Sequence, residues 1–411
     1  MLMKILYQIA LRKSVLNLVI VLDSFPGGGS FQYDQTILKA VFSLPSDRYK
    51  ITVLYANDIW AKYLGKTIRK QKTPFHAGYE RFLQFMIMSG IPINLLRSIA
   101  GFLDSSVKMI EFYRPDLTVF SSQNAFRGYL VKGATLLTIH DLMHRYEKRF
   151  PEASGNGRSR YREHHFAAIC KYATGILADS DVGKQQIISS YSVSPGKIHV
   201  LPYTAPPYIR EKENSTNHDS HFDLPPKYLF YPAQFWQHKN HDKLLRALDL
   251  VRKEIPDIKL VLVGSQKNSY KSVVRLAKKL LLDDIVIFRQ YIPDYDMPEY
   301  YRRARALIMP TYFGPTNIPP LEAFAVGCPV AISKIYGIPD QVGDAALLFN
   351  PESIQEIAAA IKALWTDDAL CLELVRRGKI MDARLSMDAF THNFGNIIGK
   401  LSISLHPQNH T

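Results

Sequence analysis

Short, continuously apolar runs rich in Val, Ile and Leu recur along this chain. In the first half they are residues 16–23, 50–56, 116–121, 134–140, 175–180 and 197–202. Strands that are buried on both faces, as in parallel sheets, show such continuous apolarity rather than an alternating pattern. Helix-like stretches, for example 33–44 and 182–191, lie between several of these runs. The alternation predicts a doubly wound α/β domain.

A second set of runs follows a polar stretch at 206–226 that prolines bracket at both ends. These runs are residues 227–233, 258–264, 284–290, 305–310, 328–333 and 345–351. A length of 411 residues, 47% of them hydrophobic, is also enough for two separate cores. We therefore predict two Rossmann-like, doubly wound parallel-sheet domains at 1–206 and 227–385, joined by a linker at 207–226. Ligands of such sheets bind at the carboxyl ends of the strands, so we expect a substrate cleft between the domains.

The cysteine content and the charge limit the class of protein. The three cysteines, Cys170, Cys328 and Cys371, lie far apart and have no metal-ligand spacing, which predicts reduced packing residues in a cytosolic protein. The formal net charge is +14, and residues 61–100 carry seven Lys or Arg residues against one Glu. The apolar stretches in this region are shorter than the ~20 residues that a membrane span needs.

Three interpretations of the basic region 61–100 remain open. It could dock on an anionic membrane surface or accept a phosphorylated lipid. It could equally be a solvated basic face over ordinary core residues. No nucleic-acid motif is recognisable, so we expect no nucleic-acid partner. The N-terminus mixes charges into its apolar run and lacks a small-residue cleavage site, which argues against a signal peptide. We expect a cytoplasmic protein, with peripheral contact at the inner face of the membrane left open.

The segment 310–339 contains the most informative motif. It combines a strand end, a Gly/Pro-rich loop and a helix that Pro319 and Pro320 begin and Gly327 ends. Backbone N–H groups at such a helix start can hold an anion, whereas the carboxylate of Glu322 can accept hydrogen bonds from a vicinal diol. A nucleotide sugar carries both groups. The alternative is that Glu322 only stabilises the helix dipole.

Two segments in the first half are candidate ligand sites. Gly28 and Gly29 lie in PGGGS, directly after the first predicted strand, where glycines allow close approach of a phosphate or a sugar. The alternative is a tight strand-to-helix turn. His140 follows a buried strand in TIHD, where it could bind a sugar hydroxyl or act as a base. A structural histidine, with Asp141 capping the next turn, is the alternative.

The segment YPAQFWQHKN at 231–240 follows the first strand of the second half. Lys239 lies at a helix start, where the dipole disfavours a cation, so we expect it to bind a diphosphate. Gln234 could donate a hydrogen bond nearby. Two D-x-D patterns, at 179–181 and 294–296, could hold a metal with a diphosphate, but both precede predicted helices and are better explained as caps. We therefore predict no metal ion and no cofactor apart from the donor substrate.

These segments, in this order, resemble the retaining family 4 glycosyltransferases of the GT-B fold. The resemblance is strongest over 227–365 and weaker over 17–205. It implies that Glu322 binds the donor ribose, that Lys239 contacts the donor diphosphate, and that His140 is the active-site histidine near the donor sugar. It also implies that Gln234 replaces a second basic residue. In this family the C-terminal helix commonly crosses back to the first domain, which residues 386–404 could do.

One departure from the family concerns Gly314. The family motif has two glutamates separated by seven residues, and the first would fall on Gly314. Thr316, Asn317, Ile318 and the loop N–H groups are therefore our remaining candidates for binding the donor at this loop.

The predicted function is a retaining, metal-independent transfer of a sugar from a nucleoside diphosphate to a hydroxyl acceptor. The acceptor would be a saccharide or a lipid-linked saccharide, as in cell-surface polysaccharide synthesis. Two alternatives remain: a nucleotide-sugar epimerase, and a non-catalytic GT-B subunit that binds a sugar or a partner. Gly314 is the best argument for the non-catalytic subunit.

Overall fold

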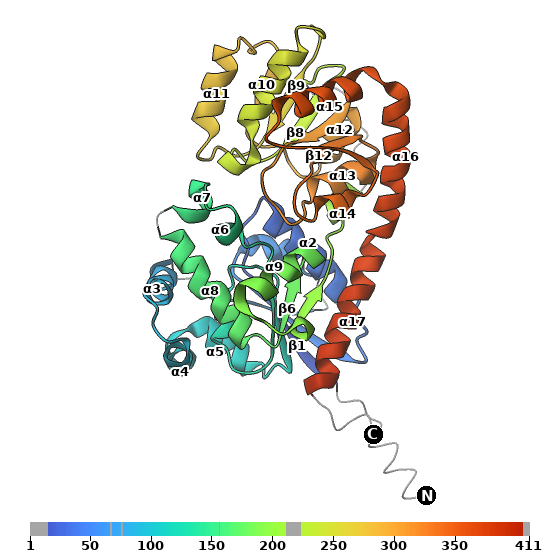
Figure 1. Cartoon of the computed structure of the whole chain (residues 1–411). Coiled ribbons are helices and arrows are strands. Elements are labelled where there is room, and N and C mark those ends of the chain that lie inside the picture. The colour runs from blue at the N-terminus through green and yellow to red at the C-terminus, as the bar shows by residue number, and fades with distance from the viewer. Residues whose placement is uncertain (1–14, 66–67, 75–76, 156, 211–222, 406–411) are drawn as a thin grey trace, which may run out of the picture. The chain divides into compact units, whose positions relative to one another are not determined.

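The computed structural model describes residues 15–65, 68–74, 77–155, 157–210 and 223–405. The chain divides into two compact units (Figure 1). Unit 1 is Met1–Leu142, Gly157–Leu201 and Phe390–Thr411, and unit 2 is Met143–Asn156 and Pro202–Ala389. These bounds differ from the predicted domains 1–206 and 227–385, chiefly because 143–156 belongs to unit 2. Most of the predicted linker 207–226 lies outside the described residues.

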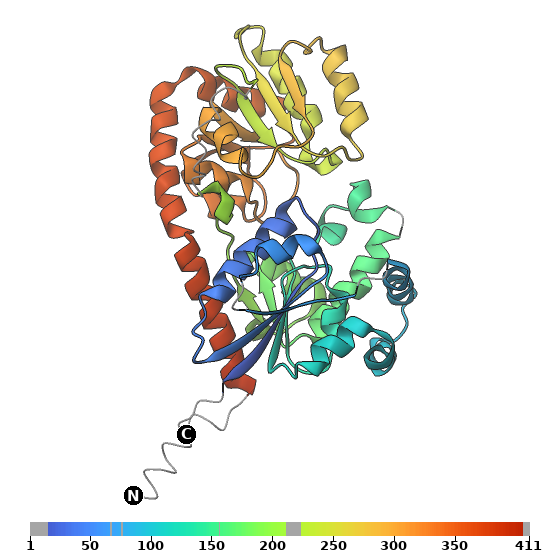
Figure 2. The ribbon, with the colours of Figure 1, turned by 180° about the vertical axis from the view of Figure 1, so that it is seen from behind.

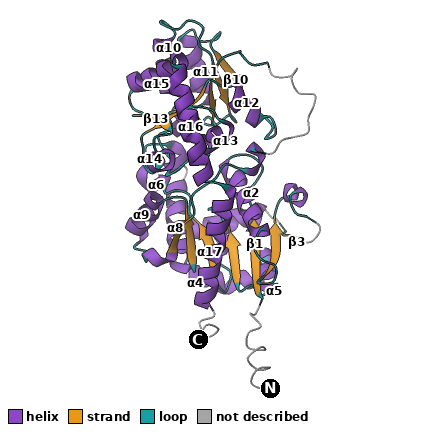
Figure 3. Ribbon diagram, turned by 90° about the vertical axis from the view of Figure 1, so that its right-hand side faces the viewer, coloured by secondary structure: helices purple, strands orange, loops and turns teal. Residues whose placement is uncertain are grey.

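Unit 1 is built on a seven-stranded, entirely parallel sheet with the order β3-β2-β1-β4-β5-β6-β7. Its strands are β1 (Leu16–Leu22), β2 (Tyr49–Tyr55), β3 (Arg69–Lys72), β4 (Leu117–Phe120), β5 (Thr135–Thr138), β6 (Gly175–Ala178) and β7 (Ile198–Val200). Helices lie on both sides of the sheet (Figures 2 and 3). They are α2 (Gly29–Phe42), α3 (Ala77–Met88), α4 (Ile93–Leu103), α5 (Ser105–Phe112), α8 (Arg158–Tyr172) and α9 (Asp181–Tyr191). Short 3-10 turns occupy Asp58–Lys62, Phe126–Tyr129 and Pro195–Lys197.

Continuous apolarity identified six of these seven strands. The residues of β4, β5 and β6 are all buried, as expected for strands covered on both faces. The prediction missed β3, whose sequence RKQK is exposed throughout and lies at the sheet edge. Charged side chains on an exposed edge strand oppose pairing with other chains, so such a strand has no apolar signal.

Unit 2 has a six-stranded parallel sheet with the order β10-β9-β8-β11-β12-β13. The strands are β8 (Leu229–Pro232), β9 (Leu260–Val263), β10 (Val286–Arg289), β11 (Ala306–Met309), β12 (Val330–Ser333) and β13 (Ala346–Phe349). All six were predicted from apolar runs. The core around them consists of aliphatic and aromatic side chains from both sheet faces.

The helices of unit 2 alternate with these strands after two short helices, α6 (Met143–Tyr146) and α7 (Pro151–Ser154). They are α10 (His241–Val251), α11 (Tyr270–Lys279), α12 (Met297–Arg303), α13 (Pro319–Val326), α14 (Ile338–Val342), α15 (Ile354–Thr366) and α16 (Asp368–Arg384), with 3-10 turns at Pro207–Ile209 and Gln237–Lys239. As predicted, α13 begins at Pro319 and ends at Gly327, whose φ of 77° is the left-handed conformation that favours glycine at a helix end.

The last helix, α17 (Met387–Leu405), runs into unit 1 at Phe390. Phe390, Phe394, Ile398 and Leu401 are buried at helical spacing along one face. Gly175 leaves room for Leu401, because a Cβ atom at Gly175 would lie 3.1 Å from the Leu401 side chain. Among the helices described, none is long and apolar enough to cross a membrane.

Candidate functional site

The predicted donor segments of unit 2 follow β8 and β11, which are neighbours in the sheet. Because both strands are parallel, their carboxyl ends meet at the same edge. The two loops are joined there by a hydrogen bond of 2.8 Å from the Tyr312 N–H to the His238 carbonyl. The structure therefore brings the segment of Gln234 and Lys239 next to the segment of Thr316, Asn317, Ile318 and Glu322.

Lys239 ends a 3-10 turn and lies one residue before the N-cap of α10, Asn240. The Tyr231 hydroxyl donates to the Lys239 carbonyl at 3.0 Å, which fixes the backbone of this loop. Asn240 has a φ of 58°, and its side chain donates to the carbonyls of Pro310 and Pro351. The predicted placement of Lys239 at a helix start is confirmed, whereas its contact with a diphosphate stays a prediction.

The loop before Lys239 is held by Glu152 of α7, which the sequence analysis did not identify. Glu152 accepts hydrogen bonds from the His238 N–H at 2.9 Å, from His238 Nδ1 at 2.7 Å and from Asn268 Nδ2 at 2.6 Å. Burial opposes the charge of Glu152, but these hydrogen bonds prevail and lower its pKa to about 2. This network also ties the segment 143–156 to unit 2. No sequence signal marks Glu152, because its partners are 86 and 116 residues away.

Gln234 follows β8 and accepts a hydrogen bond of 2.9 Å from the indole N–H of Trp236. Gly264, at the end of β9, allows this backbone to pack closely. A Cβ atom at Gly264 would lie 2.2 Å from the Ala233 carbonyl oxygen and 2.8 Å from the Gln234 nitrogen, distances that no side chain can adopt. Gly264 is thus required for the position of the Gln234 loop, and the sequence analysis did not single it out.

Glu322 lies in the first turn of α13, as predicted, but it is only 3% exposed. The hydroxyls of Tyr208 and Tyr301 donate to its two carboxylate oxygens, the second at 2.5 Å. Burial raises the pKa of Glu322, and the two tyrosine hydroxyls counteract this. Its role in ribose binding stays a prediction, and a ribose would have to share or replace these tyrosine hydroxyls.

The loop before α13 contains Thr316, Asn317 and Ile318. Gln341 clamps it, since the Asn317 N–H donates to Gln341 Oε1 at 3.0 Å and Gln341 Nε2 donates to the Asn317 carbonyl at 2.7 Å. Asn317 is 8% exposed, and its side-chain Nδ2 has no hydrogen-bond partner among the described residues. A buried, unpaired amide donor is costly unless a ligand satisfies it.

Gly314 has a φ of 134°, which a residue with a side chain rarely adopts. A Cβ atom there would lie 2.6 Å from Asn317 Nδ2 and 3.0 Å from the Thr316 carbonyl oxygen. The departure at Gly314 is therefore more than the loss of one carboxylate. Asn317 fills the space that a side chain at position 314 would need.

In unit 1, Gly28 and Gly29 form the start of α2. Gly28 is its N-cap with a φ of 83°, and Gly29 is its first residue. Positive φ values at Gly27 and Gly28 make this turn one that glycine alone adopts readily. The helix start has no side-chain cap. Both the turn and the ligand interpretation of PGGGS are compatible with this geometry.

His140 lies two residues after β5, and its ring contacts Tyr33 of α2 edge-on, with 4.8 Å between the ring centroids. Its backbone N–H donates to Gln123 Oε1 at 3.1 Å. Burial lowers the pKa of His140 to about 4, although nearby Asp141 acts in the opposite direction. The ring is therefore neutral at physiological pH, so it has one nitrogen that can accept a proton.

Two carboxylates near the end of β1, the buried Asp34 and the half-buried Asp23, were not predicted. Ser24 donates from its hydroxyl to Asp34 Oδ2 at 2.6 Å. Burial raises the pKa of Asp34 to about 7 and that of Asp23 to about 6, and hydrogen bonds from serine side chains oppose both shifts. Their sequence signals were weak, because Asp23 only ends an apolar run and Asp34 lies alone in a helix.

The capping interpretation holds for one of the two D-x-D patterns. Ser180 caps α9 by accepting a hydrogen bond from the Gly183 N–H at 3.0 Å. Asp296 occupies the N-cap position of α12, but it makes no side-chain hydrogen bond to the helix, so the expected cap is wrong there. In the part of the chain that the structure describes, no group of three or more His, Cys, Asp or Glu side chains is arranged to hold a metal ion.

The family model that matches this sequence covers residues within unit 2. Residues 213–381 match the family model described as "Glycosyl transferases group 1". The serotype-specific mannosyltransferase WbdA of Escherichia coli is 24% identical over 230 residues, 55% of this chain and 27% of WbdA. The O-antigen chain mannosyltransferase B of Escherichia coli is 27% identical over 223 residues, 53% of this chain and 58% of that protein. The chain thus spans less than two thirds of the length of either relative.

Among solved structures, HepE of Anabaena in complex with UDP-glucose has a TM-score of 0.71 and 15% identity, covering 94% of this chain and all of HepE. At this identity the similarity concerns the fold. It confirms the predicted GT-B class at the level of two Rossmann-like, parallel-sheet units. Residues 213–381 are thus similar in sequence to the glycosyl transferases group 1 family.

Proposed function

We propose that this protein transfers a sugar from a nucleoside diphosphate donor to a hydroxyl of a saccharide or lipid-linked saccharide acceptor. The transfer retains the configuration at the anomeric carbon and requires no metal ion. Two relatives are named as mannosyltransferases of surface polysaccharides, and a solved neighbour binds UDP-glucose, which supports this class of donor and acceptor. The proposed location is the cytoplasm, at the inner face of the membrane.

The observation that carries the proposal is the loop Gly314–Ile318 at the start of α13. This helix start has no side-chain cap, and the buried Asn317 Nδ2 beside it is unpaired within the described part of the chain. The dipole of α13 favours negative charge, such as a phosphate, at its start, and an unpaired amide donor suits a sugar hydroxyl. A nucleotide sugar carries both a phosphate and sugar hydroxyls, so this one ligand would satisfy both features of the loop.

Each candidate residue has a role in this proposal. Lys239 and the positive end of the α13 dipole stabilise the negative charge on the departing diphosphate, the main electrostatic requirement of the transfer. Asn317, together with Thr316 and Ile318, makes the contacts to the donor sugar that the first glutamate of the family motif would make. In unit 1, neutral His140 accepts a hydrogen bond from a sugar hydroxyl, and Gly28 and Gly29 permit close approach of the ligand.

The proposed membrane contact is made by the helices α3 and α4. Phe102 is 79% exposed, and α4 presents Leu95, Phe102 and Leu103 at spacings of seven and eight residues, on one helix face. On α3, Phe82 and Phe85 are also exposed. Figures 1 and 2 both show α3 and α4 at one side of unit 1. Together with the basic residues of 61–100, this face suits an anionic bilayer.

The test measures release of nucleoside diphosphate from a panel of UDP-, GDP- and ADP-sugars, with and without membrane-extracted acceptors. We expect release from one donor, only with acceptor, undiminished by EDTA. NMR of the product should show the same anomeric configuration as in the donor. The Asn317→Ala variant should lose most of this activity, whereas the exposed-lysine variant Lys253→Ala should keep it.

Each part of the proposal has a contrary outcome. Product without acceptor would indicate an epimerase. Nucleotide binding without any release, across the panel, would indicate a non-catalytic subunit. An inverted product would contradict the retaining mechanism, and loss of activity with EDTA, restored by a divalent cation, would contradict metal independence.

A further inference from the structure

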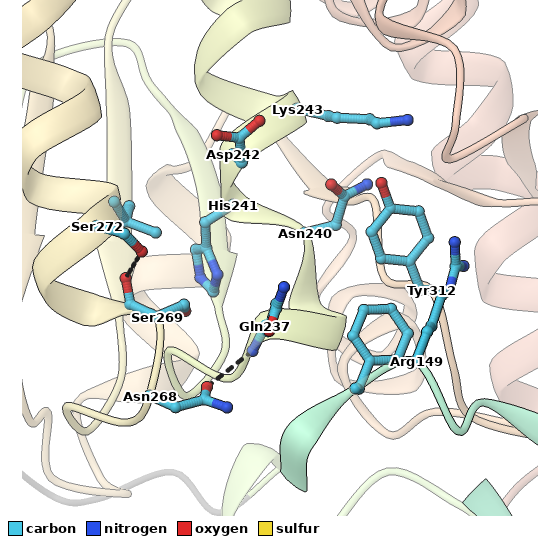
Figure 4. A pocket seen from close by; sticks show the side chains of 12 residues that line it. Arg149, Gln237, Asn240, His241, Asp242, Lys243, Asn268, Ser269, Ser272 and Tyr312 are labelled. Carbon is cyan, nitrogen blue, oxygen red and sulfur yellow. Dashed lines mark hydrogen bonds between the residues drawn. The ribbon is translucent and has the colours of Figure 1, made fainter. Parts of the chain in front are cut away.

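Unit 2 contains a cavity of about 550 Å³ that none of the predicted donor-site residues lines. It lies among the first turns of α10 and α11, with Arg149 and Tyr312 on another side (Figure 4). This volume is within the range of small-molecule sites. A cavity of this size, with a polar lining and beside the donor segments, is therefore a candidate binding site for a second ligand.

His241, the first residue of α10, lines the cavity although it is only 2% exposed. Neither of its ring nitrogens has a hydrogen-bond partner among the described residues. Its ring stacks on Phe235 at 4.5 Å and packs against Tyr231 at 5.0 Å between centroids, so its orientation is fixed. Figure 4 shows the ring between the side chains of Ser269 and Gln237.

The His241 ring is neutral at physiological pH. Burial lowers its pKa to about 3, and the charges of Lys239 and His238 lower it further. An interaction with the Ala233 backbone, whose geometry falls short of a hydrogen bond, acts in the opposite direction. A neutral imidazole has one N–H donor and one acceptor nitrogen. Leaving both unpaired in a buried position is unfavourable, so a ligand with a hydrogen-bonding oxygen at the ring edge would stabilise this arrangement.

Two helix starts face the same cavity, and neither has a side-chain cap. The residues that would cap them are engaged elsewhere. Asn240 donates to the carbonyls of Pro310 and Pro351, each at 2.9 Å, and the Ser269 hydroxyl donates to the Phe235 carbonyl at 2.6 Å. In α11 the Tyr270 N–H donates to the Lys267 carbonyl, so the N–H groups of Lys271 and Ser272 and those of the first turn of α10 are the ones available to an anion. Both helix dipoles favour negative charge there.

The charged side chains around the cavity do not repel an anion overall. Arg149 and Lys243 line it, and both pair with Glu352. Asp242 also lines it and would repel an anion, but its carboxylate is paired with Arg246 at 2.7 Å. Because these charged side chains are paired with one another, the two helix starts supply the positive potential in the cavity.

We propose that this cavity binds a phosphate group, held by the edge of the His241 ring and by the first-turn N–H groups of α10 and α11. The volume exceeds what the phosphate alone occupies. The side-chain amide of Gln237 suits a hydroxyl of a phosphorylated sugar, so the source of the phosphate is either the free ion or a sugar phosphate. This site is separate from the donor site at α13.

The substitution that tests the site is Ser272→Glu, with Ser272→Gln as its matched control. Ser272 is exposed, lies in the first turn of α11 and bonds through its hydroxyl only to the Ser269 carbonyl in the described structure. Glutamate and glutamine are similar in size, and an acidic residue in the first turn favours a helix. Weaker binding in Ser272→Glu alone would thus report the added charge and not a loss of folding.

The ligands are inorganic phosphate and glucose 6-phosphate, added to the full chain labelled with ¹⁵N-histidine. The His241 ring signals, assigned through the His241→Gln variant, should shift saturably at constant ionic strength, with chloride as the control ion. Ser272→Glu should weaken binding about tenfold or more, the effect of about 1.4 kcal/mol, whereas Ser272→Gln should bind like the wild type. Tighter binding of glucose 6-phosphate would identify a sugar phosphate as the source, and equal binding would identify the free ion.

The same titration in Lys239→Met separates this site from the donor site. If the proposal is right, the His241 signals still shift in Lys239→Met, whatever happens to donor binding. The proposal is overturned if phosphate leaves the His241 signals unchanged, if Ser272→Glu and Ser272→Gln bind equally, or if Lys239→Met alone abolishes the shift. Because no sugar donor is involved, failure of the glycosyltransferase assay would leave this result unaffected.

Discussion

The hydroxyl of Tyr301 donates a 2.5 Å hydrogen bond to Oε2 of Glu322, and both side chains are buried. Tyr208 donates to the other carboxylate oxygen. Glu322 was identified from the sequence as a ligand-binding carboxylate, yet in the structure it also satisfies two buried tyrosine hydroxyls. Its substitution should therefore affect stability as well as ligand binding.

We expect Glu322→Ala to lower the free energy of unfolding by about 3 kcal/mol, because two buried hydroxyls lose their acceptor. Tyr301→Phe removes one of the two donors and should cost less. Urea unfolding measures both, with the exposed Tyr291→Phe as the control. If Glu322 also binds ribose, Glu322→Ala should weaken nucleotide binding in the folded protein far more than Tyr301→Phe. Unchanged stability of Glu322→Ala would contradict the structural role.

The sequence predicted the elements of the fold because parallel strands buried on both faces have a strong local signal. It did not predict β3, whose exposed residues RKQK carry no apolar pattern. It also could not predict that 143–156 belongs to unit 2, because the contacts of Glu152 are with residues more than 80 positions away.

The candidate site was predictable to a similar extent. The helix start at Pro319 and the position of Lys239 just before a helix follow from local sequence signals, and both are confirmed. The tyrosine partners of Glu322 and the Asn317–Gln341 clamp depend on tertiary packing, which no local pattern encodes. The packing of the Asn317 side chain against Gly314 likewise depends on tertiary structure and has no local sequence signal.

Gly314→Glu should reduce activity, although it restores the glutamate of the family motif. The backbone at φ 134° disfavours any side chain, and its Cβ atom would lie 2.6 Å from Asn317 Nδ2. The loop must therefore move, at a cost of roughly 1–3 kcal/mol. Thermal unfolding and donor binding should both decline, and Gly314→Ala should have most of the effect on stability. Increased turnover in Gly314→Glu would contradict this account.

Lys239→Ala should mainly lower kcat, by roughly 10²-fold, because the lysine stabilises charge that develops as the diphosphate departs. KM for the donor should change less. Steady-state kinetics with the donor identified by the panel measures both constants, and Lys253→Ala, an exposed lysine on unit 2, is the charge-matched control. An increase in KM with unchanged kcat would instead indicate that Lys239 contributes equally to substrate and transition-state binding.

Asp34→Asn should change how stability depends on pH. The pKa of Asp34 is raised to about 7 in the folded protein by burial, above its ordinary value of 3.8. The folded state therefore binds this proton more tightly, so the contribution of Asp34 to stability is present at low pH and is lost as pH rises towards 7. His140, whose pKa is lowered to about 4, acts in the opposite direction below its ordinary pKa of 6.5.

In Asp34→Asn the neutral amide replaces the protonated acid, and the contribution of His140 is unchanged. The stability of the variant relative to the wild type should thus increase between pH 4 and pH 7 and remain constant above that. Urea unfolding at several pH values measures this, with the exposed Asp47→Asn as the control. A stability difference that does not vary with pH would show that Asp34 is ionised throughout this range.

The double variant Leu95→Ser and Phe102→Ser should weaken binding to vesicles that contain anionic phosphatidylglycerol. Both side chains are more than half exposed on one face of α4, so their replacement should leave the fold intact. Each apolar side chain that inserts contributes about 1–2 kcal/mol, so the double variant should bind at least tenfold more weakly. Leu372→Ser, at a side chain of unit 2 that is 72% exposed, is the matched control. Equal binding of the double variant and the control, or binding that is indifferent to the anionic lipid and to salt, would show that α4 is not the docking face.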